Sequence, residues 1–220
     1  MFGTLLRTAA AVILVAAVTM PQARAQKPAG LALEVVGEVS PPLAPFTEIT
    51  DGTVLALGTG GRLTFAHYNT CREVTVAGGE LAIGRLWYDV AGGRIEREAQ
   101  QDCPKEIRAQ RSGGQAGGLV LRAGPSGREL PTRPYFVLVG RRAGDITGVI
   151  VTRGGKTVAD LPLDGRRFSW PDHLPALKHR GDYRLVLRGR DGSDAFSLDF
   201  IASKTKDTDR PRPLTLLRVD

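Results

Sequence analysis

The sequence predicts an all-β protein with two domains in tandem, a β-meander followed by a β-sandwich. Three observations support this fold class. Short runs of alternating apolar and polar residues fill most of the chain after residue 25. The chain contains 27 glycines and 14 prolines, which is typical of a protein with many turns. No segment after residue 25 shows the apolar spacing of a strong amphipathic helix.

Residues 1–25 have the features of a secretory signal peptide. Arg7 precedes an apolar run, Ala9–Met20, that is shorter than the roughly 20 residues of a membrane-spanning helix. The small residues of Ala23–Ala25 predict cleavage before Gln26. No cysteine stands at the cleavage point, and no paired arginine precedes the apolar run. We therefore expect a periplasmic or secreted protein without a transmembrane segment in its mature chain.

The chain has two cysteines, Cys71 and Cys103. In an exported protein an even pair of cysteines normally forms a disulfide, which we expect here. The chain-entropy model gives about 3.5–4 kcal/mol for a loop of this length. Two alternatives stay open. His67 and Asp102 could join both thiolates around zinc, although structural zinc sites usually pair their ligands more closely. A Cys–His nucleophile would need a reduced thiol and an orienting third group.

The first domain is predicted over residues 26–110. Turns at Gly58–Gly61, Gly78–Gly79 and Gly92–Gly93 predict three hairpins. The apolar alternation changes phase at Gly84-Arg85, which predicts a β-bulge. The composition of Arg94–Gln101 favours a helix, but its position after a Gly-Gly turn favours a strand. Strands are expected at 31–39, 51–57, 62–68, 72–77, 80–84, 85–91 and 94–98.

The Gly-rich segment 111–118 is predicted to be a linker. After it, residues 119–203 carry about seven strand patterns, the number found in an immunoglobulin-like sandwich. Tyr183 opens a strand two residues after a glycine, as in the tyrosine corner of such sandwiches, and Trp170 is a candidate core aromatic. The pattern resembles immunoglobulin-like and fibronectin type III modules. Residues 204–220 are predicted to be a polar tail, although their end, LTLLRV, could add a closing strand.

The first domain, residues 31–110, resembles the periplasmic domain of FecR-type (ferric-citrate) regulators. That family has an Asp-Gly-Ser/Thr turn and then the pattern Arg-x-Val-x₄-Gly-Glu-x₂-Phe. Here DGT is followed by Arg72, Val74, Gly79, Glu80 and Ile83 in the same order. The resemblance implies a β recognition domain. Sigma-factor control is not implied, because the family's cytoplasmic segment and membrane helix have no counterpart in this sequence.

Candidate binding residues are aromatic or basic. Trp87 and Tyr88 are adjacent, so they point to opposite faces of a strand, and the exposed one could stack on a sugar ring or a partner. Arg141-Arg142 and Arg166-Arg167 could converge on an anion. No cofactor or metal site is predicted, because no motif for a phosphate cradle, a nucleophile elbow or a calcium loop is present.

These observations favour a non-enzymatic module of the cell envelope that serves recognition, assembly or signalling. The net charge of +7 favours anionic surroundings. We expect the partner to be an envelope protein, peptidoglycan or another anionic polymer, and expect no nucleic acid. The alternative is a secreted hydrolase with an unrecognised carboxylate site. Its candidate acids are Glu80, Asp89, Asp102, Asp160 and Asp164.

Overall fold

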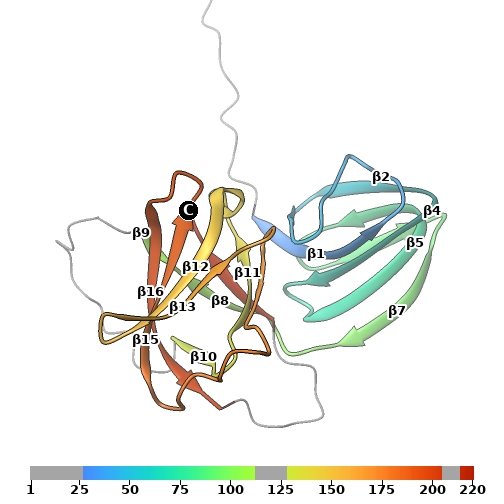
Figure 1. Cartoon of the computed structure of the whole chain (residues 1–220). Coiled ribbons are helices and arrows are strands. Elements are labelled where there is room, and N and C mark those ends of the chain that lie inside the picture. The colour runs from blue at the N-terminus through green and yellow to red at the C-terminus, as the bar shows by residue number, and fades with distance from the viewer. Residues whose placement is uncertain (1–26, 112–127, 205–213) are drawn as a thin grey trace, which may run out of the picture.

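The computed structural model describes residues 27–111, 128–204 and 214–220, which form two β domains side by side (Figure 1). The all-β fold class is confirmed. Within the described ranges the helical content is one short 3-10 turn, Ala143–Asp145. None of the described residues belongs to a helix long and apolar enough to cross a membrane. The predicted signal peptide and most of the predicted linker lie outside the described residues.

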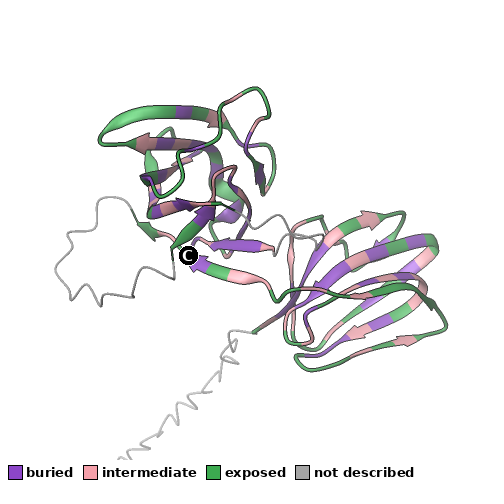
Figure 2. Cartoon of the chain, turned by 90° about the horizontal axis from the view of Figure 1, so that it is seen from below, coloured by how far each residue is buried: buried purple, intermediate pink, exposed green. Residues whose placement is uncertain are grey.

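The first domain is a single antiparallel sheet. Its strands alternate buried and exposed residues, as the banding in Figure 2 shows. The order across the sheet is β3-β1-β4-β5-β6, with β2 also on β4 and β7 also on β5. The strands are β1 (Pro28–Val36), β2 (Val39–Ser40), β3 (Glu48–Thr50), β4 (Thr53–His67), β5 (Arg72–Ile83), β6 (Tyr88–Ala91) and β7 (Arg94–Gln100).

A row of glycines bends this sheet into two halves that face each other. Along β4 and β5 the pairing jumps from Leu57↔Gly79 to Arg62↔Ala77. One half carries β2 and β6, and the other carries β1, β3 and β7. The ring of Phe65 from one half meets that of Tyr88 from the other at 5.6 Å between centroids. Apolar side chains of both halves therefore share one core.

The three predicted hairpins in this domain are wrong. β4 runs through Gly58–Gly61 and β5 runs through Gly78–Gly79 without reversing. The chain also keeps its direction at Gly92–Gly93, because β6 and β7 pair with successive parts of β5. Glycine supplies positive φ angles to bends as readily as to turns, so the glycine pairs did not distinguish the two.

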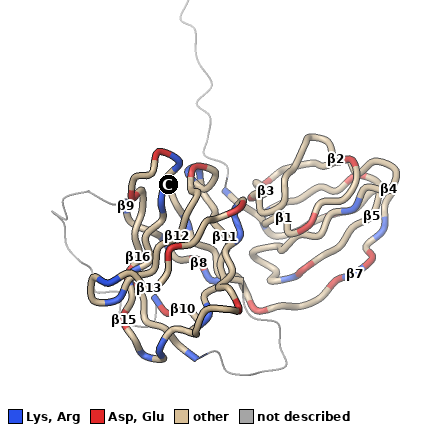
Figure 3. The backbone as a smooth tube through the Cα atoms, in the orientation of Figure 1, with Lys and Arg blue, Asp and Glu red and all other residues tan. Residues whose placement is uncertain are grey.

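The chain reverses at other places. It turns between β4 and β5, and again at Gly84–Trp87, where the Gly84 N–H donates to the Trp87 carbonyl at 2.9 Å. The phase change at Gly84-Arg85 therefore marks a hairpin loop and not a bulge. The predicted strand over Arg94–Gln101 is confirmed as β7, whose acidic and basic residues alternate along its length (Figure 3).

The second domain packs two sheets around one apolar core. The larger has the order β10-β16-β15-β12-β13 with β9 on β16, and the smaller has the order β14-β11-β17-β8. The strands are β8 (Lys105–Arg108), β9 (Gln110–Arg111), β10 (Glu129–Pro131), β11 (Tyr135–Val139), β12 (Ile146–Arg153), β13 (Lys156–Pro162), β14 (Arg167–Ser169), β15 (Asp182–Gly189), β16 (Asp194–Ser203) and β17 (Thr215–Arg218).

The structure moves two of the predicted domain boundaries. β8 and β9 were assigned to the first domain, 26–110, but they pair with β17 and β16 of the second. In the predicted polar tail, 204–220, the alternative of a closing strand in LTLLRV is confirmed, because this segment contains β17, which lies between β11 and β8 in the smaller sheet. Both outcomes depend on pairings between segments far apart in sequence, which local patterns do not contain.

Two local predictions in the second domain are confirmed. Trp170 is 4% exposed, and its indole N–H donates to the Pro175 carbonyl at 3.2 Å. The Tyr183 hydroxyl accepts the Lys178 backbone N–H at 2.9 Å, the backward contact expected of a tyrosine corner. An immunoglobulin-like topology stays a prediction, because sheet order alone does not assign the domain to that class.

Candidate binding groove between the two domains

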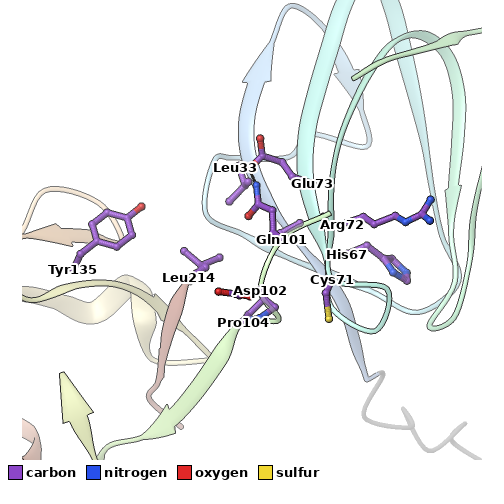
Figure 4. A pocket seen from close by; sticks show the side chains of 11 residues that line it. Leu33, His67, Cys71, Arg72, Glu73, Gln101, Asp102, Pro104, Tyr135 and Leu214 are labelled. Atoms are coloured by element: carbon purple, nitrogen blue, oxygen red, sulfur yellow. Dashed lines mark hydrogen bonds between the residues drawn. The ribbon is translucent and has the colours of Figure 1, made fainter. Parts of the chain in front are cut away.

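A groove lies where the two domains meet (Figure 4). It encloses a cavity of about 170 Å³. Tyr135 and Leu214 of the second domain face Leu33 and Glu73 of the first across it, as Figure 4 shows. The remaining lining residues are Ala66, His67, Cys71, Arg72, Gln101, Asp102 and Pro104.

A disulfide fixes the wall that the first domain contributes. Cys71 in the β4–β5 turn is bonded to Cys103 in the connection to β8, with their Cα atoms 4.6 Å apart. The predicted disulfide is therefore confirmed, and the zinc and free-thiol alternatives are wrong because both sulfurs are bonded to each other. The Gln101 N–H also donates to the Cys71 carbonyl at 2.8 Å. The connection between the domains is thus held against the first sheet.

Two carboxylates, Glu73 and Asp102, line the first-domain side of the groove together with Arg72, which is paired with Glu98. The Glu73 carboxylate accepts a hydrogen bond from the Gln101 amide and lies 3.9 Å from the Arg97 guanidinium. Asp102 is exposed at the rim. Leu33, Leu214 and Pro104 supply apolar surface beside these carboxylates. A side chain with an apolar stem and a cationic end matches this combination.

A second hollow meets the first at Tyr135. It encloses about 340 Å³ and is also lined by Arg133, Ser169, Trp170 and Asp172. The Arg133 guanidinium lies 3.7 Å from the Asp172 carboxylate. The Arg167 guanidinium stands over the Tyr135 ring, 5.3 Å from its centroid. Tyr135 therefore separates an acidic hollow from one with two arginines nearby.

Apolar side chains from both domains form a shared cluster next to the groove. Leu31 of β1 packs with Val137 and Val139 of β11 and with Leu216 of β17. The partly buried residues packed against them are Leu33, Phe46, Tyr68 and Leu214. The relative position of the groove walls is therefore determined by core-like packing.

An ion-pair network closes the same interface. Arg218 bonds to Glu48 of the first domain at 2.7 Å and to Glu106 at 2.9 Å. Burial alone would raise the pKa of Glu106, but the hydrogen bonds and charge of Arg218 outweigh it and hold this pKa below its usual value. Burial, followed by the charge of Glu48, raises the pKa of the Tyr68 hydroxyl far above its usual value. Arg218 and Glu106 are thus held in their charged forms.

His67 lines the groove, but its ring is engaged elsewhere. The Nε2–H donates to the Gly84 carbonyl at 2.9 Å, and Nδ1 meets the Thr70 hydroxyl at 2.9 Å and the Thr70 N–H at 3.3 Å. The side chain is fully buried. These partners assign the proton to Nε2 and occupy both nitrogens, so His67 fixes two turns of the first domain.

Of the two adjacent aromatic residues, Tyr88 is packed inward and Trp87 is exposed. Tyr88 packs inward between Phe65 and His67, and its hydroxyl donates to Glu98. That bond, followed by the contact with Arg72, holds the pKa of Glu98 below its usual value. Trp87 is 55% exposed at the end of the first domain. Of the pair, only Trp87 offers a free surface.

The predicted arginines are only partly brought together. An Arg166 Nη2 atom lies 3.9 Å from where a Cβ on Gly144 would stand, and the Arg190 guanidinium donates to the Gly144 carbonyl at 3.4 Å. Arg142 pairs with Asp145 at 2.5 Å beside them. Arg141 lies in the same loop, whereas Arg167 points to Tyr135. Sequence reasoning did not anticipate Arg190 in this cluster.

The carboxylates that were candidates for a hydrolase site do not lie together in one cleft. Asp160 pairs with Arg188 at 2.7 Å on the second domain, and Asp102 lies at the groove rim. Glu80 and Asp89 stand on strands of the first domain. Within the described ranges, no three histidine, cysteine or acidic side chains gather as a metal site would require.

Comparison with known proteins places the chain in no family. No family model, no curated protein and no solved structure matches it. The residues that resemble FecR-type domains, Arg72, Val74, Gly79, Glu80 and Ile83, all lie on β5. That resemblance stays a prediction.

Proposed function

We propose that this chain is an exported, non-catalytic recognition protein that binds an extended segment of a partner protein in the groove between its domains. One observation carries the proposal. Two hollows meet at Tyr135, and the walls of the first come from both domains. Such an elongated site, preformed by packed domains, suits an unfolded or loop segment, because little ordering of the protein is needed on binding.

The charges of the two hollows suggest what the segment carries. Glu73 and Asp102 favour a lysine or arginine whose stem lies against Leu33 and Leu214. Arg133 and Arg167, on the other side of Tyr135, favour a carboxylate or backbone carbonyl. Opposite charges at the two ends would fix the direction of the bound segment.

Export is supported by two features. The disulfide between Cys71 and Cys103 is compatible with an oxidising compartment. Residues 1–25 have the sequence features of a signal peptide. These two features together support a periplasmic or secreted location for the recognition protein.

The arginine cluster around Gly144 favours a second candidate, binding of an anionic polymer. Arg141, Arg142, Arg166 and Arg190 lie at one end of the second domain. Asp145 offsets part of this charge by pairing with Arg142. Replacing Arg166 and Arg190 together by glutamine would then weaken retention on a polyanion column at low salt, and unchanged retention would exclude this surface.

Site-specific photocrosslinking tests the groove. A photoreactive amino acid at Ser169, which lines the second hollow, should capture a discrete protein from envelope extract. The matched control carries it at Val158, an exposed position on β13 away from the groove. Capture should disappear in Tyr135→Ala and in Glu73→Lys proteins that melt like the parent. Equal capture at both positions, or none at Ser169, would overturn the proposal.

A further inference from the structure

We propose that Trp87 is a stacking platform for a sugar ring, and that the hairpin loop Gly84–Trp87 binds a carboxylated polysaccharide. This site lies at the end of the first domain and is independent of the groove. The proposal rests on three features: the packing of the indole, the hydrogen bonds that hold the loop, and the charges beside the loop.

The indole lies flat on a glycine. A Cβ added at Gly84 would stand 2.5 Å from both Nε1 and Cε2 of Trp87 and 3.0 Å from its Cδ2. Nε1, Cε2 and Cδ2 are consecutive ring atoms, and an atom in the ring plane beside the first two would lie much farther from Cδ2, so these distances place Gly84 over the ring face. The side chain is nevertheless 55% exposed. One ring face is therefore supported by backbone, and the other is open.

Hydrogen bonds from two other segments, the end of β4 with the turn after it and the β3–β4 connection, hold the loop rigid. The Gly84 carbonyl accepts the His67 Nε2–H at 2.9 Å, and the Arg85 N–H donates to Asp51 Oδ1 at 2.9 Å. The Asn69 side-chain amide donates to the Arg85 carbonyl. A platform fixed in this way loses little conformational entropy when a ligand stacks on it.

The open ring face suits a pyranose better than it suits a membrane. The C–H groups on one face of a sugar ring carry partial positive charge, and the face of an indole is negative, so the two stack. A side chain that inserts into lipid would project from the loop, whereas Trp87 lies along it. Asp51 and Asn69 place polar atoms against the backbone of Arg85 in the same loop, and sugar hydroxyls need such partners nearby.

The charge at this end favours an acidic sugar. Arg85 is exposed, and within the described ranges no ion pair holds its guanidinium. Lys27 lies at the same end, because its carbonyl accepts the Asp51 N–H at 2.9 Å. A carboxylate on the stacked ring could accept hydrogen bonds from the Arg85 side chain.

Tryptophan fluorescence measures this binding directly. The chain has two tryptophans, and Trp170 is 4% exposed, so a change in emission on titration reports Trp87. We expect saturable binding of polygalacturonate in low salt and weaker binding of dextran, a neutral glucan. Trp87→Ala should weaken retention on immobilised polygalacturonate about tenfold, and Arg85→Gln about threefold at low salt. Equal affinity for both polymers would overturn the role of Arg85.

Two further variants separate a sugar platform from a membrane anchor. Gly84→Ala keeps Trp87 but pushes the ring off its support, and the clash is with a flexible side chain, so the protein should still fold. It should weaken retention on polygalacturonate about as much as Trp87→Ala does. Leu86→Ser removes the apolar neighbour, which is 67% exposed, and should leave that binding unchanged. Binding to phosphatidylglycerol vesicles that Leu86→Ser abolishes and Gly84→Ala preserves would replace the sugar with a lipid surface.

Discussion

At the scale of single residues, His67 shows how one buried polar side chain organises an end of the molecule. Its ring links the turn after β4 to the loop after β5, because Thr70 and the Gly84 carbonyl are its two partners. A buried histidine that satisfies both nitrogens is a structural group and not a free base. The position of Trp87 depends on it, since Gly84 supports the indole.

Replacing His67 by alanine should lower the free energy of unfolding by about 2–4 kcal/mol. The substitution leaves the Gly84 carbonyl without its donor and opens a cavity next to Tyr88. Urea unfolding followed by circular dichroism measures the loss. The matched control, His179→Ala, removes an exposed histidine and should cost less than about 1 kcal/mol. Similar losses for both variants would show that His67 does not anchor the two turns.

The lowered pKa of Glu106 predicts a pH dependence of stability. A carboxyl whose pKa is lower in the folded state stabilises the fold above its unfolded pKa, about 4.3 for glutamate, and the contribution is lost as the pH falls through the folded pKa. Glu106→Gln should therefore lose stability less steeply than the parent between about pH 5 and pH 3.

Urea titrations across this range measure the two slopes. Since Arg218 causes the lowered pKa, the difference between the parent and Glu106→Gln should shrink when Arg218 is replaced by alanine in both proteins. Parallel stability curves for the parent and Glu106→Gln would contradict the assigned cause.

At the scale of elements, the glycine row decides the shape of the first domain. Gly61, Gly79 and Gly93 each lie so close to neighbouring backbone that a Cβ would stand within 2.9 Å of it. Strand positions were predictable from alternation, because it depends on residues near each other in sequence. Whether a glycine pair reverses a strand or bends it depends on the partner strand, and that information is not local.

Gly93→Ala should destabilise the protein by about 3 kcal/mol or more. A Cβ at Gly93 would stand 2.1 Å from the Gly78 carbonyl oxygen, and these glycines directly adjoin the paired residues Arg94 and Ala77, which limits how far either backbone can move. The control is its neighbour. Gly92→Ala meets no atom within 4 Å and carries only the cost of a positive φ, about 1 kcal/mol. Thermal melts that rank the two variants in the opposite order would contradict a close-packed bend.

The last strand shows a different limit of local patterns. β17 has Leu216 in the cluster between the domains and Leu217 in the core of the second domain. A strand buried on both faces does not alternate, so the sequence allowed a closing strand here only as an alternative to the polar tail. Tyr183 and Trp170 were predictable because their partners, Lys178 and Pro175, lie within five residues of them.

At the scale of the whole molecule, the candidate groove could not be read from the sequence. Its walls come from residues as distant as Leu33 and Leu214. Only the disulfide at its edge followed from composition and from the predicted export, because two cysteines in a chain expected to be exported leave one pairing. The same holds for the contact between the domains, where Arg218 reaches Glu48 across most of the chain.

Arg218→Ala should uncouple the two domains. Arg218 and Glu48 have side chains only 11% and 16% exposed, so removing the arginine leaves a carboxylate largely buried without its main partner. Breaking such a pair costs about 3 kcal/mol or more. Because the pair spans the interface, the lost free energy is that of the contact between the two domains. In calorimetry, the unfolding transition of Arg218→Ala should therefore be broader than that of the parent or should divide in two.

The control for this variant is Arg184→Ala, which breaks an exposed pair with Asp199 on the second domain and should cost less than about 1 kcal/mol while keeping one transition. Binding in the groove should weaken in Arg218→Ala and not in Arg184→Ala, because only the former loosens the two walls relative to each other. If Arg218→Ala melts as one transition with unchanged midpoint, the apolar cluster around Leu31 alone joins the domains. The ion pair between Arg218 and Glu48 would then not stabilise the contact between the two domains.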